Sequence, residues 1–175
     1  GFDTADYSAA TAAVSVRMDG VASTGGEALG DVLNSIERVV GSAFADTIAG
    51  SFGNDVIEGG AGNDQLQGLD GDDTLLGGLG DDVIAGGLGA DMIDGSAGND
   101  IADYSASGAA VTAYLDGTAG VGGDAQGDII TNVETLRGSA FGDVLHGGTG
   151  DDTLLGLSGD DRLVGGAGAD MLDGG

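Results

Sequence analysis

The sequence contains no cysteine, no proline, no tryptophan and no lysine. Without cysteine, neither a disulfide framework nor a cysteine-based zinc site can form. The only basic residues are four scattered arginines, Arg17, Arg38, Arg137 and Arg162. Nucleic acids and anionic lipid surfaces bind clustered basic residues, so neither is an expected partner. No apolar run approaches the ~20 residues of a transmembrane helix, and we expect no membrane insertion.

Glycine and acidic residues are abundant instead. The chain of 175 residues has 39 glycines and a formal net charge of -26. Such a composition is typical of disordered segments, because glycine loses much conformational freedom on folding and like charges repel. A regular array of aliphatic residues argues against disorder here.

Aspartate recurs every nine residues in two arrays. Each aspartate is followed two residues later by an inward-facing aliphatic position such as Ile57, Leu66 or Leu75, and most are preceded by a glycine-rich turn. The unit reads Gly-Gly-x-Gly-x-Asp-x-(Ile/Leu)-x, which is typical of a calcium-binding parallel β-helix repeat. The aspartates in phase are Asp46, Asp55, Asp64, Asp73, Asp82, Asp91 and Asp100, then Asp143, Asp152, Asp161 and Asp170.

The repeat predicts a coil of short parallel strands. The three residues after each turn form a strand with one side chain facing inward. Two nonapeptides complete a flattened coil of 18 residues, so aspartates 18 apart in sequence stack on the same edge. Stacked carboxylates need a cation, and calcium takes six to eight oxygen ligands, which glycine turns can supply as main-chain carbonyls.

With these two arrays the chain resembles the RTX family of bacterial proteins exported by type I secretion. The resemblance implies an all-β fold, a right-handed parallel β-roll (a β-solenoid) with calcium ions between stacked turns. It implies ions between Asp55 and Asp73, Asp73 and Asp91, Asp64 and Asp82, and Asp82 and Asp100. It further implies ions between Asp46 and Asp64, Asp143 and Asp161, and Asp152 and Asp170. In the "GSAFAD" and "GSAFGD" turns, Phe44 and Phe141 replace a turn glycine.

The resemblance also implies main-chain carbonyl ligands. They lie four and two residues before the first aspartate of a pair, and five and three before the second. The implied donors are Ser51, Gly53, Gly60, Gly62, Gly68, Leu69, Asp70, Gly71, Gly77, Gly78, Leu79, Gly80, Gly86, Leu88, Gly95, Ala97, Gly148, Gly150, Gly165 and Ala167. The expected total is five to eight calcium ions.

A longer repeat interrupts the arrays. Residues 1–46 match residues 98–143 without a gap, with 24 identities, and both copies carry a "DYS" motif. We therefore divide the chain into an insert at 1–43, a first array at 44–102, a second copy of the insert at 103–140 and a second array at 141–175. Valines and other apolar residues alternate in the first half of each insert, which predicts a strand with one buried face. We expect the chain to be a piece of a longer repetitive protein.

Motifs for catalysis are absent. The chain has no catalytic triad, no HExxH zinc motif and no EF-hand loop, and we expect no enzyme activity. Adjacent carboxylates such as Asp72 and Asp73 could suggest glycosidase chemistry, but their recurrence at the array spacing favours turn and ligand roles. The single histidine, His146, fits an ordinary surface position.

Two pairs of insert residues leave alternatives open. Tyr7 and Tyr104 could stack on a sugar or pack at the start of each insert. Asp31 and Asp128 could bind further calcium or cap a turn.

The sequence therefore favours a noncatalytic, calcium-dependent folding and secretion module of an exported bacterial protein, secreted or at the cell surface. Its expected partners are calcium and neighbouring domains of a longer chain. The first alternative is a rigid adhesive or surface-layer segment. The second is a carbohydrate-contacting module of an extracellular enzyme whose catalytic domain lies elsewhere.

Overall fold

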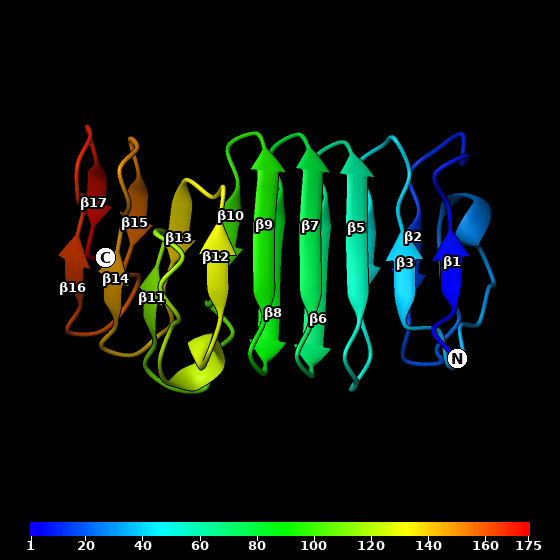
Figure 1. Ribbon diagram of the computed structural model, residues 1–175, viewed down its shortest axis with the longest axis horizontal. Coiled ribbons are helices and arrows are strands. Elements are labelled where there is room, and N and C mark those ends of the chain that lie inside the picture. The colour runs from blue at the N-terminus through cyan, green and yellow to red at the C-terminus, as the bar shows by residue number, and fades with distance from the viewer.

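The computed structural model describes all 175 residues as one stack of flattened coils (Figure 1). Parallel strands alternate between two facing layers. In Figure 1 the nearer strands run upward, the farther strands run downward and each coil shifts to the left, so the solenoid is right-handed. The expected all-β parallel β-roll is confirmed.

The strands form three sheets. One layer is an eight-stranded sheet of order β17-β15-β13-β10-β8-β6-β4-β2, and the facing layer is a six-stranded sheet of order β1-β3-β5-β7-β9-β12 and a three-stranded sheet of order β11-β14-β16. Their bounds are β1 Thr4–Asp6, β2 Ser15–Arg17, β3 Arg38–Val40, β4 Thr47–Ala49, β5 Val56–Ala61, β6 Gln65–Asp70, β7 Thr74–Leu79, β8 Val83–Leu88, β9 Met92–Ala97, β10 Ile101–Asp103, β11 Thr112–Tyr114, β12 Ile129–Thr131, β13 Thr135–Arg137, β14 Val144–His146, β15 Thr153–Leu155, β16 Arg162–Val164 and β17 Met171–Asp173.

The register within the arrays is 18 residues. Ile57 pairs with Leu75, and Leu75 with Ile93, so the aliphatic residue of each repeat lies directly above that of the coil before. These three side chains are fully buried, as are Ile48, Leu66 and Ile84 on the facing sheet. Burying one such side chain contributes roughly 1.5 to 3 kcal/mol, and the repeat supplies one per nonapeptide. The core is therefore a double row of aliphatic residues between the two edges of aspartates.

Strands in the first array are longer than the sequence predicts. From β5 to β9 each strand has six residues, whereas the repeat predicts three. The extra residues are turn glycines and their neighbours, which also pair with the next coil, as Gly60 does with Gly78. The turns of this array are thus held in register by backbone pairing as well as by their aspartates.

Each insert changes the length of one coil. In the second insert, β10 pairs with β13 at an offset of 34 residues, and β9 pairs with β12 at an offset of 37. The added chain supplies β11 and β12 to one layer, while the opposite layer continues without a gap. The first copy repeats the pattern, because β1 pairs with β3 at the same offset of 34. The insert is therefore part of the solenoid stack.

Helical structure is limited to two single turns of 3-10 helix, η1 (Gly26–Ala28) and η2 (Gly123–Ala125), one in each insert. Neither helix is long and apolar enough to cross a membrane.

Candidate metal sites between stacked turns

The repeat aspartates form hydrogen-bonded columns along each edge of the roll. In seven of the eleven repeat aspartates the backbone amide donates to Oδ1 of the aspartate 18 residues later. The distance is 2.8 Å from Asp55 to Asp73 and from Asp64 to Asp82, and 2.9 Å from Asp73 to Asp91. The same bond joins Asp46 to Asp64, Asp82 to Asp100, Asp143 to Asp161 and Asp152 to Asp170. One carboxylate oxygen of each inner aspartate therefore faces the preceding turn.

The second carboxylate oxygen of most of these residues has no hydrogen-bond partner. These oxygens are buried, and they are Oδ2 of Asp64, Asp73, Asp82, Asp91, Asp100 and Asp161. A buried charged oxygen without a partner is costly, and such oxygens in native proteins are usually paired or bound to a metal. The orphaned oxygens therefore indicate where a cation would bind.

Four of the six orphaned oxygens, those of Asp64, Asp73, Asp82 and Asp100, share their space with a main-chain carbonyl from the next coil. A Cβ at Gly59 would lie 2.5 Å from both Oδ2 of Asp64 and the carbonyl oxygen of Gly77. A Cβ at Gly77 would likewise lie 2.3 Å from Oδ2 of Asp82 and 2.7 Å from the carbonyl oxygen of Gly95. Only glycine leaves room for the two oxygens to converge. The structure brings the predicted donors Gly68, Gly77, Gly86, Gly95 and Gly165 to their aspartates in this way.

A second group of predicted donors points along the stack. The carbonyl oxygens of Gly60 and Gly62 lie 2.1 and 2.2 Å from the Cβ positions of Gly78 and Gly80, in the gap between adjacent turns. Gly53, Leu69, Gly71, Gly80, Gly148 and Gly150 are placed alike.

Three further predicted donors already accept a backbone hydrogen bond. The carbonyls of Leu79, Leu88 and Ala97 accept hydrogen bonds from turn glycines of the preceding coil, at 2.7, 2.8 and 2.9 Å. Each of these oxygens keeps a second lone pair. Ser51, Asp70, Gly78 and Ala167 lie in the same turns, and their role as donors stays a prediction.

Burial raises the pKa of several aspartates in the columns. Desolvation raises the pKa of Asp73 to about 7 and that of Asp64, Asp91 and Asp100 to about 6, although backbone amides that donate to these carboxylates oppose the shift. The neighbouring carboxylates in each column raise the pKa further, as Asp91 and Asp55 do for Asp73. A bound divalent cation would reverse this effect, because it stabilises the ionised form.

The donor set fits calcium. No three histidine, aspartate or glutamate side chains gather into a metal-binding cluster, so each candidate site combines a carboxylate pair with carbonyls. An all-oxygen set of this kind suits a hard cation, and calcium accepts many oxygens in flexible geometry.

The two turns that carry a phenylalanine differ from the rest. Ser42 donates to Asp46 from both its backbone amide and its hydroxyl, so both Asp46 oxygens have a partner in this turn. Ser139 and Asp143 make the same two bonds. These aspartates are already satisfied, so their turns are weaker candidate sites than those of Asp64 and Asp82.

Asp128 continues one column although it lies outside the nonapeptide arrays. Its Oδ1 accepts a 2.9 Å hydrogen bond from the amide of Asp91, as a repeat aspartate would. Its Oδ2 accepts a 2.8 Å bond from the hydroxyl of Tyr104, which is 2 % exposed. Asp31 accepts the equivalent bond from Tyr7. Tyr104 is therefore packed inside the fold and is not free to stack on a sugar. Its hydroxyl caps Oδ2 of Asp128.

Sequence reasoning missed two glutamates in the columns. Glu37 precedes β3 and Glu134 precedes β13, each at the position that a repeat aspartate occupies before its strand. Glu134 Oε2 accepts a 2.9 Å hydrogen bond from the amide of Asp100. The signal was present, because each glutamate lies nine residues before an aspartate of the array, Asp46 or Asp143.

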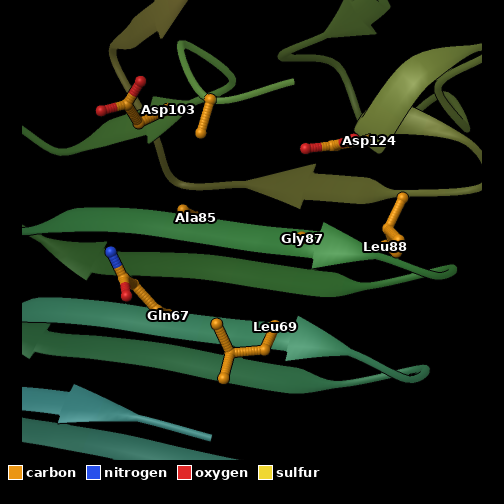
Figure 2. A pocket seen from close by; sticks show the side chains of 8 residues that line it. Gln67, Leu69, Ala85, Gly87, Leu88, Asp103 and Asp124 are labelled. Carbon is orange, nitrogen blue, oxygen red and sulfur yellow. The ribbon is translucent and has the colours of Figure 1, made fainter. Parts of the chain in front are cut away.

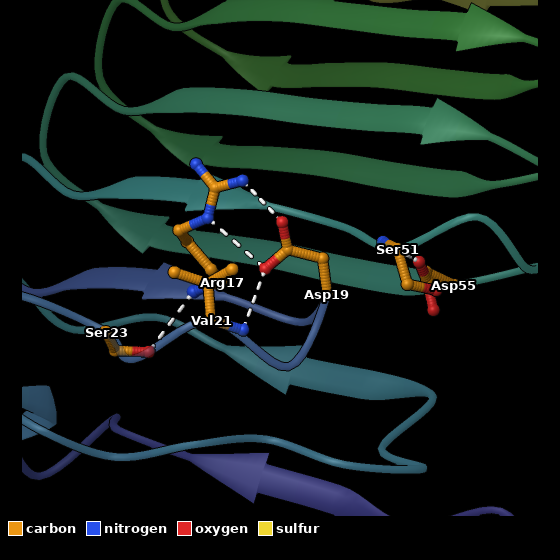
Figure 3. A network of polar contacts seen from close by, with 6 residues as sticks. All are labelled: Arg17, Asp19, Val21, Ser23, Ser51 and Asp55. Atoms are coloured by element: carbon orange, nitrogen blue, oxygen red, sulfur yellow. Dashed lines mark hydrogen bonds and ion pairs between the residues drawn. The ribbon is translucent and has the colours of Figure 1, made fainter.

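Three of the four arginines are paired with single acidic residues away from the columns. Arg17 pairs with Asp19 (Figure 3), Arg38 with Glu58 at 2.6 Å and Arg137 with Asp103 at 2.8 Å. Figure 3 also shows Ser51, whose amide donates to Asp55 Oδ2 at 2.6 Å. The columns themselves therefore have no basic partner.

The outer surface of β6 and β8 forms a shallow pocket against the second insert (Figure 2). Its volume is about 300 Å³, and its lining includes Gln67, Leu69, Ala85, Leu88 and Asp124. No aromatic side chain lines this pocket, so it offers no stacking platform for a sugar ring. His146 instead stacks on Tyr114, with ring centroids 4.7 Å apart.

Comparison with protein families agrees with this geometry. The family model for the RTX calcium-binding nonapeptide repeat matches residues 34–66, 67–102 and 137–172. These ranges include every aspartate of the two arrays and leave Asp128 and Glu134 outside. No curated protein matches the chain.

Proposed function

The chain belongs to the RTX calcium-binding nonapeptide repeat family and is a calcium-binding repeat module, and on this premise we propose that it folds when calcium binds outside the cell and supports secretion of a longer protein. RTX repeats are typical of secreted bacterial proteins. In the proposed role the aspartates bind no calcium in the cytosol, where calcium is scarce, and the chain stays unfolded there. After export they bind calcium and the chain folds.

The single observation that carries the proposal is the set of buried Oδ2 atoms without partners along both edges of the roll. With a formal net charge of -26, a fold that also buries carboxylates has strong self-repulsion. Extracellular calcium modules bind at roughly 10⁻⁴ to 10⁻³ M, so millimolar calcium would fill such sites and cytosolic calcium would leave them empty.

We propose that the repeat aspartates and the turn carbonyls named above hold five to eight ions, most of them in the first array. At ten times the dissociation constant each site stabilises the fold by about 1.4 kcal/mol, and seven sites by about 10 kcal/mol. That sum equals the whole stability of a typical domain, so the calcium-free chain should be largely unfolded. The module itself is noncatalytic in this proposal, and any enzyme activity belongs to other parts of a longer protein.

Circular dichroism tests the proposal. In excess chelator the chain should lose its β signature, and millimolar calcium should restore it. Sodium chloride at matched ionic strength is the first control, because screening relieves repulsion without coordination. Magnesium is the second control, because it demands a tight octahedral shell and loses water reluctantly. A full β signature in chelator would contradict the proposal, and equal rescue by magnesium would contradict the ligand assignment.

A rigid adhesive or surface-layer segment is the second candidate. The observation that favours it is the stacking of the insert into the solenoid, which produces one uninterrupted eight-stranded sheet from β2 to β17. Such a stack could act as a spacer of fixed length. Small-angle scattering with calcium should then show a rod whose length is the same at all protein concentrations.

A further inference from the structure

The second insert places a glutamate where the column of the eight-stranded sheet would otherwise lose its carboxylate. Glu134 immediately precedes β13, and Asp100 immediately precedes the neighbouring strand β10. The amide of Asp100 donates to Oε2 of Glu134 at 2.9 Å, which is the bond that Asp82 makes to Asp100 at 2.8 Å. Glu134 therefore replaces the next repeat aspartate at a sequence distance of 34 residues.

A carbonyl of the insert completes the same arrangement. A Cβ at Gly95 would lie 2.6 Å from Oδ2 of Asp100 and 2.1 Å from the carbonyl oxygen of Asn132. In the regular turn one coil earlier, the Cβ position of Gly77 is flanked by Oδ2 of Asp82 and the carbonyl oxygen of Gly95. Asn132 thus provides the carbonyl that a turn glycine provides elsewhere.

The turn before β13 is shorter than the glycine turns of the arrays, and the backbone conformation of Asn132 explains how this turn still brings a carbonyl beside Asp100. Its φ is +50°, a left-handed conformation that asparagine tolerates better than most residues. Ser35, its counterpart in the first insert, has a φ of +55°. The longer side chain of glutamate then spans the distance that a full glycine turn would cover.

An oxygen without a partner points into this space. Asp100 is fully buried, and its Oδ2 has no hydrogen-bond partner. Since Oδ1 of Asp100 is already occupied by the amide of Asp82, the free oxygen faces the turn of Asn132 and Glu134.

We propose that Asp100 and Glu134, with the carbonyl of Asn132, form a further calcium site that lies between the two arrays. The proposal rests on the calcium-dependent function proposed above. It makes the column continuous from Asp46 through Asp100 and Glu134 to Asp170, so the insert links the arrays electrostatically as well as by strand pairing.

The variant Glu134→Gln tests the site. Glutamine keeps an oxygen that can accept the bond from Asp100 and removes the negative charge. Glu37→Gln is the matched control, because Glu37 accepts the same bond from the amide of Asp3 at 2.8 Å, but Asp3 is exposed to solvent. Calorimetric titration with calcium should find one ion fewer in Glu134→Gln than in Glu37→Gln. Equal ion counts in the two variants would overturn the proposal.

A crystal structure of the unaltered chain grown with calcium gives a second readout that does not depend on how the variants fold. The expected result is an ion about 2.3 to 2.6 Å from Oδ2 of Asp100, from a carboxylate oxygen of Glu134 and from the Asn132 carbonyl. Ions in the arrays with none beside Asp100 would overturn this site and leave the proposed function intact. A chain that binds no calcium at all would overturn both.

Discussion

The backbone amide of Asp64 donates a 2.8 Å hydrogen bond to Oδ1 of Asp82, and the other carboxylate oxygen of Asp82 is buried without a partner. Asp82 thus faces the preceding turn with one oxygen and the following turn with the other. The first prediction is that Asp82→Asn weakens two calcium sites at once. At ten times the dissociation constant the loss of two sites lowers stability by about 3 kcal/mol.

Calcium titration by calorimetry and urea unfolding in calcium measure this effect. Asp81→Asn is the control, because Asp81 is an exposed neighbour whose carboxylate accepts a bond from the amide of Asn99, while its own amide donates to Oδ1 of Asn63 and is kept in the variant. Asp170→Asn, in the last turn, should cost less than Asp82→Asn. An unchanged ion count in Asp82→Asn would show that the column is not a set of shared ligands.

The nine-residue period predicted the regular part of this fold because it fixes which side chain faces inward. Once Ile57, Leu75 and Ile93 are in phase, the 18-residue coil and the stacking of Asp55 on Asp73 follow from strand geometry. The period does not predict the six-residue strands, because pairing of turn residues such as Gly60 and Gly78 depends on how closely two coils approach.

Spacing also failed at the insert. Asp91 meets Asp128 across 37 residues and Asp100 meets Glu134 across 34, and neither distance is a multiple of nine. The folded insert, with two strands added to one layer, shows that Asp128 and Glu134 continue the two columns, although of these two only Glu134 keeps the nine-residue spacing, since it lies nine residues before Asp143. The repeat pattern likewise did not predict that the Ser42 hydroxyl donates a hydrogen bond to Asp46 in the phenylalanine turn, because the pattern specifies glycines in its turns.

The second prediction concerns the glycine that borders each site. Gly77→Ala places a methyl group 2.3 Å from Oδ2 of Asp82 and 2.7 Å from the Gly95 carbonyl oxygen, where the cation would bind. We expect a lower calcium affinity and a lower melting temperature in calcium. Gly108→Ala is the control, because a Cβ there meets no atom within 4 Å, and it should change stability by less than about 0.5 kcal/mol. Equal effects of the two substitutions would argue against a crowded cation site.

The third prediction is a pH dependence of opposite sign with and without calcium. Burial raises the pKa of Asp73 from 3.8 to about 7 and the pKa of Asp64, Asp91 and Asp100 to about 6. The calcium-free fold therefore binds more protons than the unfolded chain between about pH 4 and pH 7, so its stability falls as pH rises through this range. Calcium must displace those protons, so its affinity rises over the same range.

Circular dichroism without calcium should show more β structure at pH 5 than at pH 8. Calcium titrations should need more calcium at pH 5 than at pH 8. A calcium-free fold that becomes more stable as pH rises would mean that the carboxylates are not desolvated in the columns.

The last prediction concerns the tyrosine that ends one column. The Tyr104 hydroxyl donates a 2.8 Å hydrogen bond to Oδ2 of Asp128, and both residues are buried. Tyr104→Phe keeps the ring but leaves that oxygen without a partner, which costs about 1 to 3 kcal/mol. Tyr7→Phe is the matched control, since Tyr7 donates the same bond to Asp31 at a more exposed site. Urea unfolding in calcium should therefore show a larger loss for Tyr104→Phe. If Tyr104→Phe instead gained a calcium ion at no cost in stability, the hydroxyl would be a barrier to a further site, and its role as a cap would be wrong.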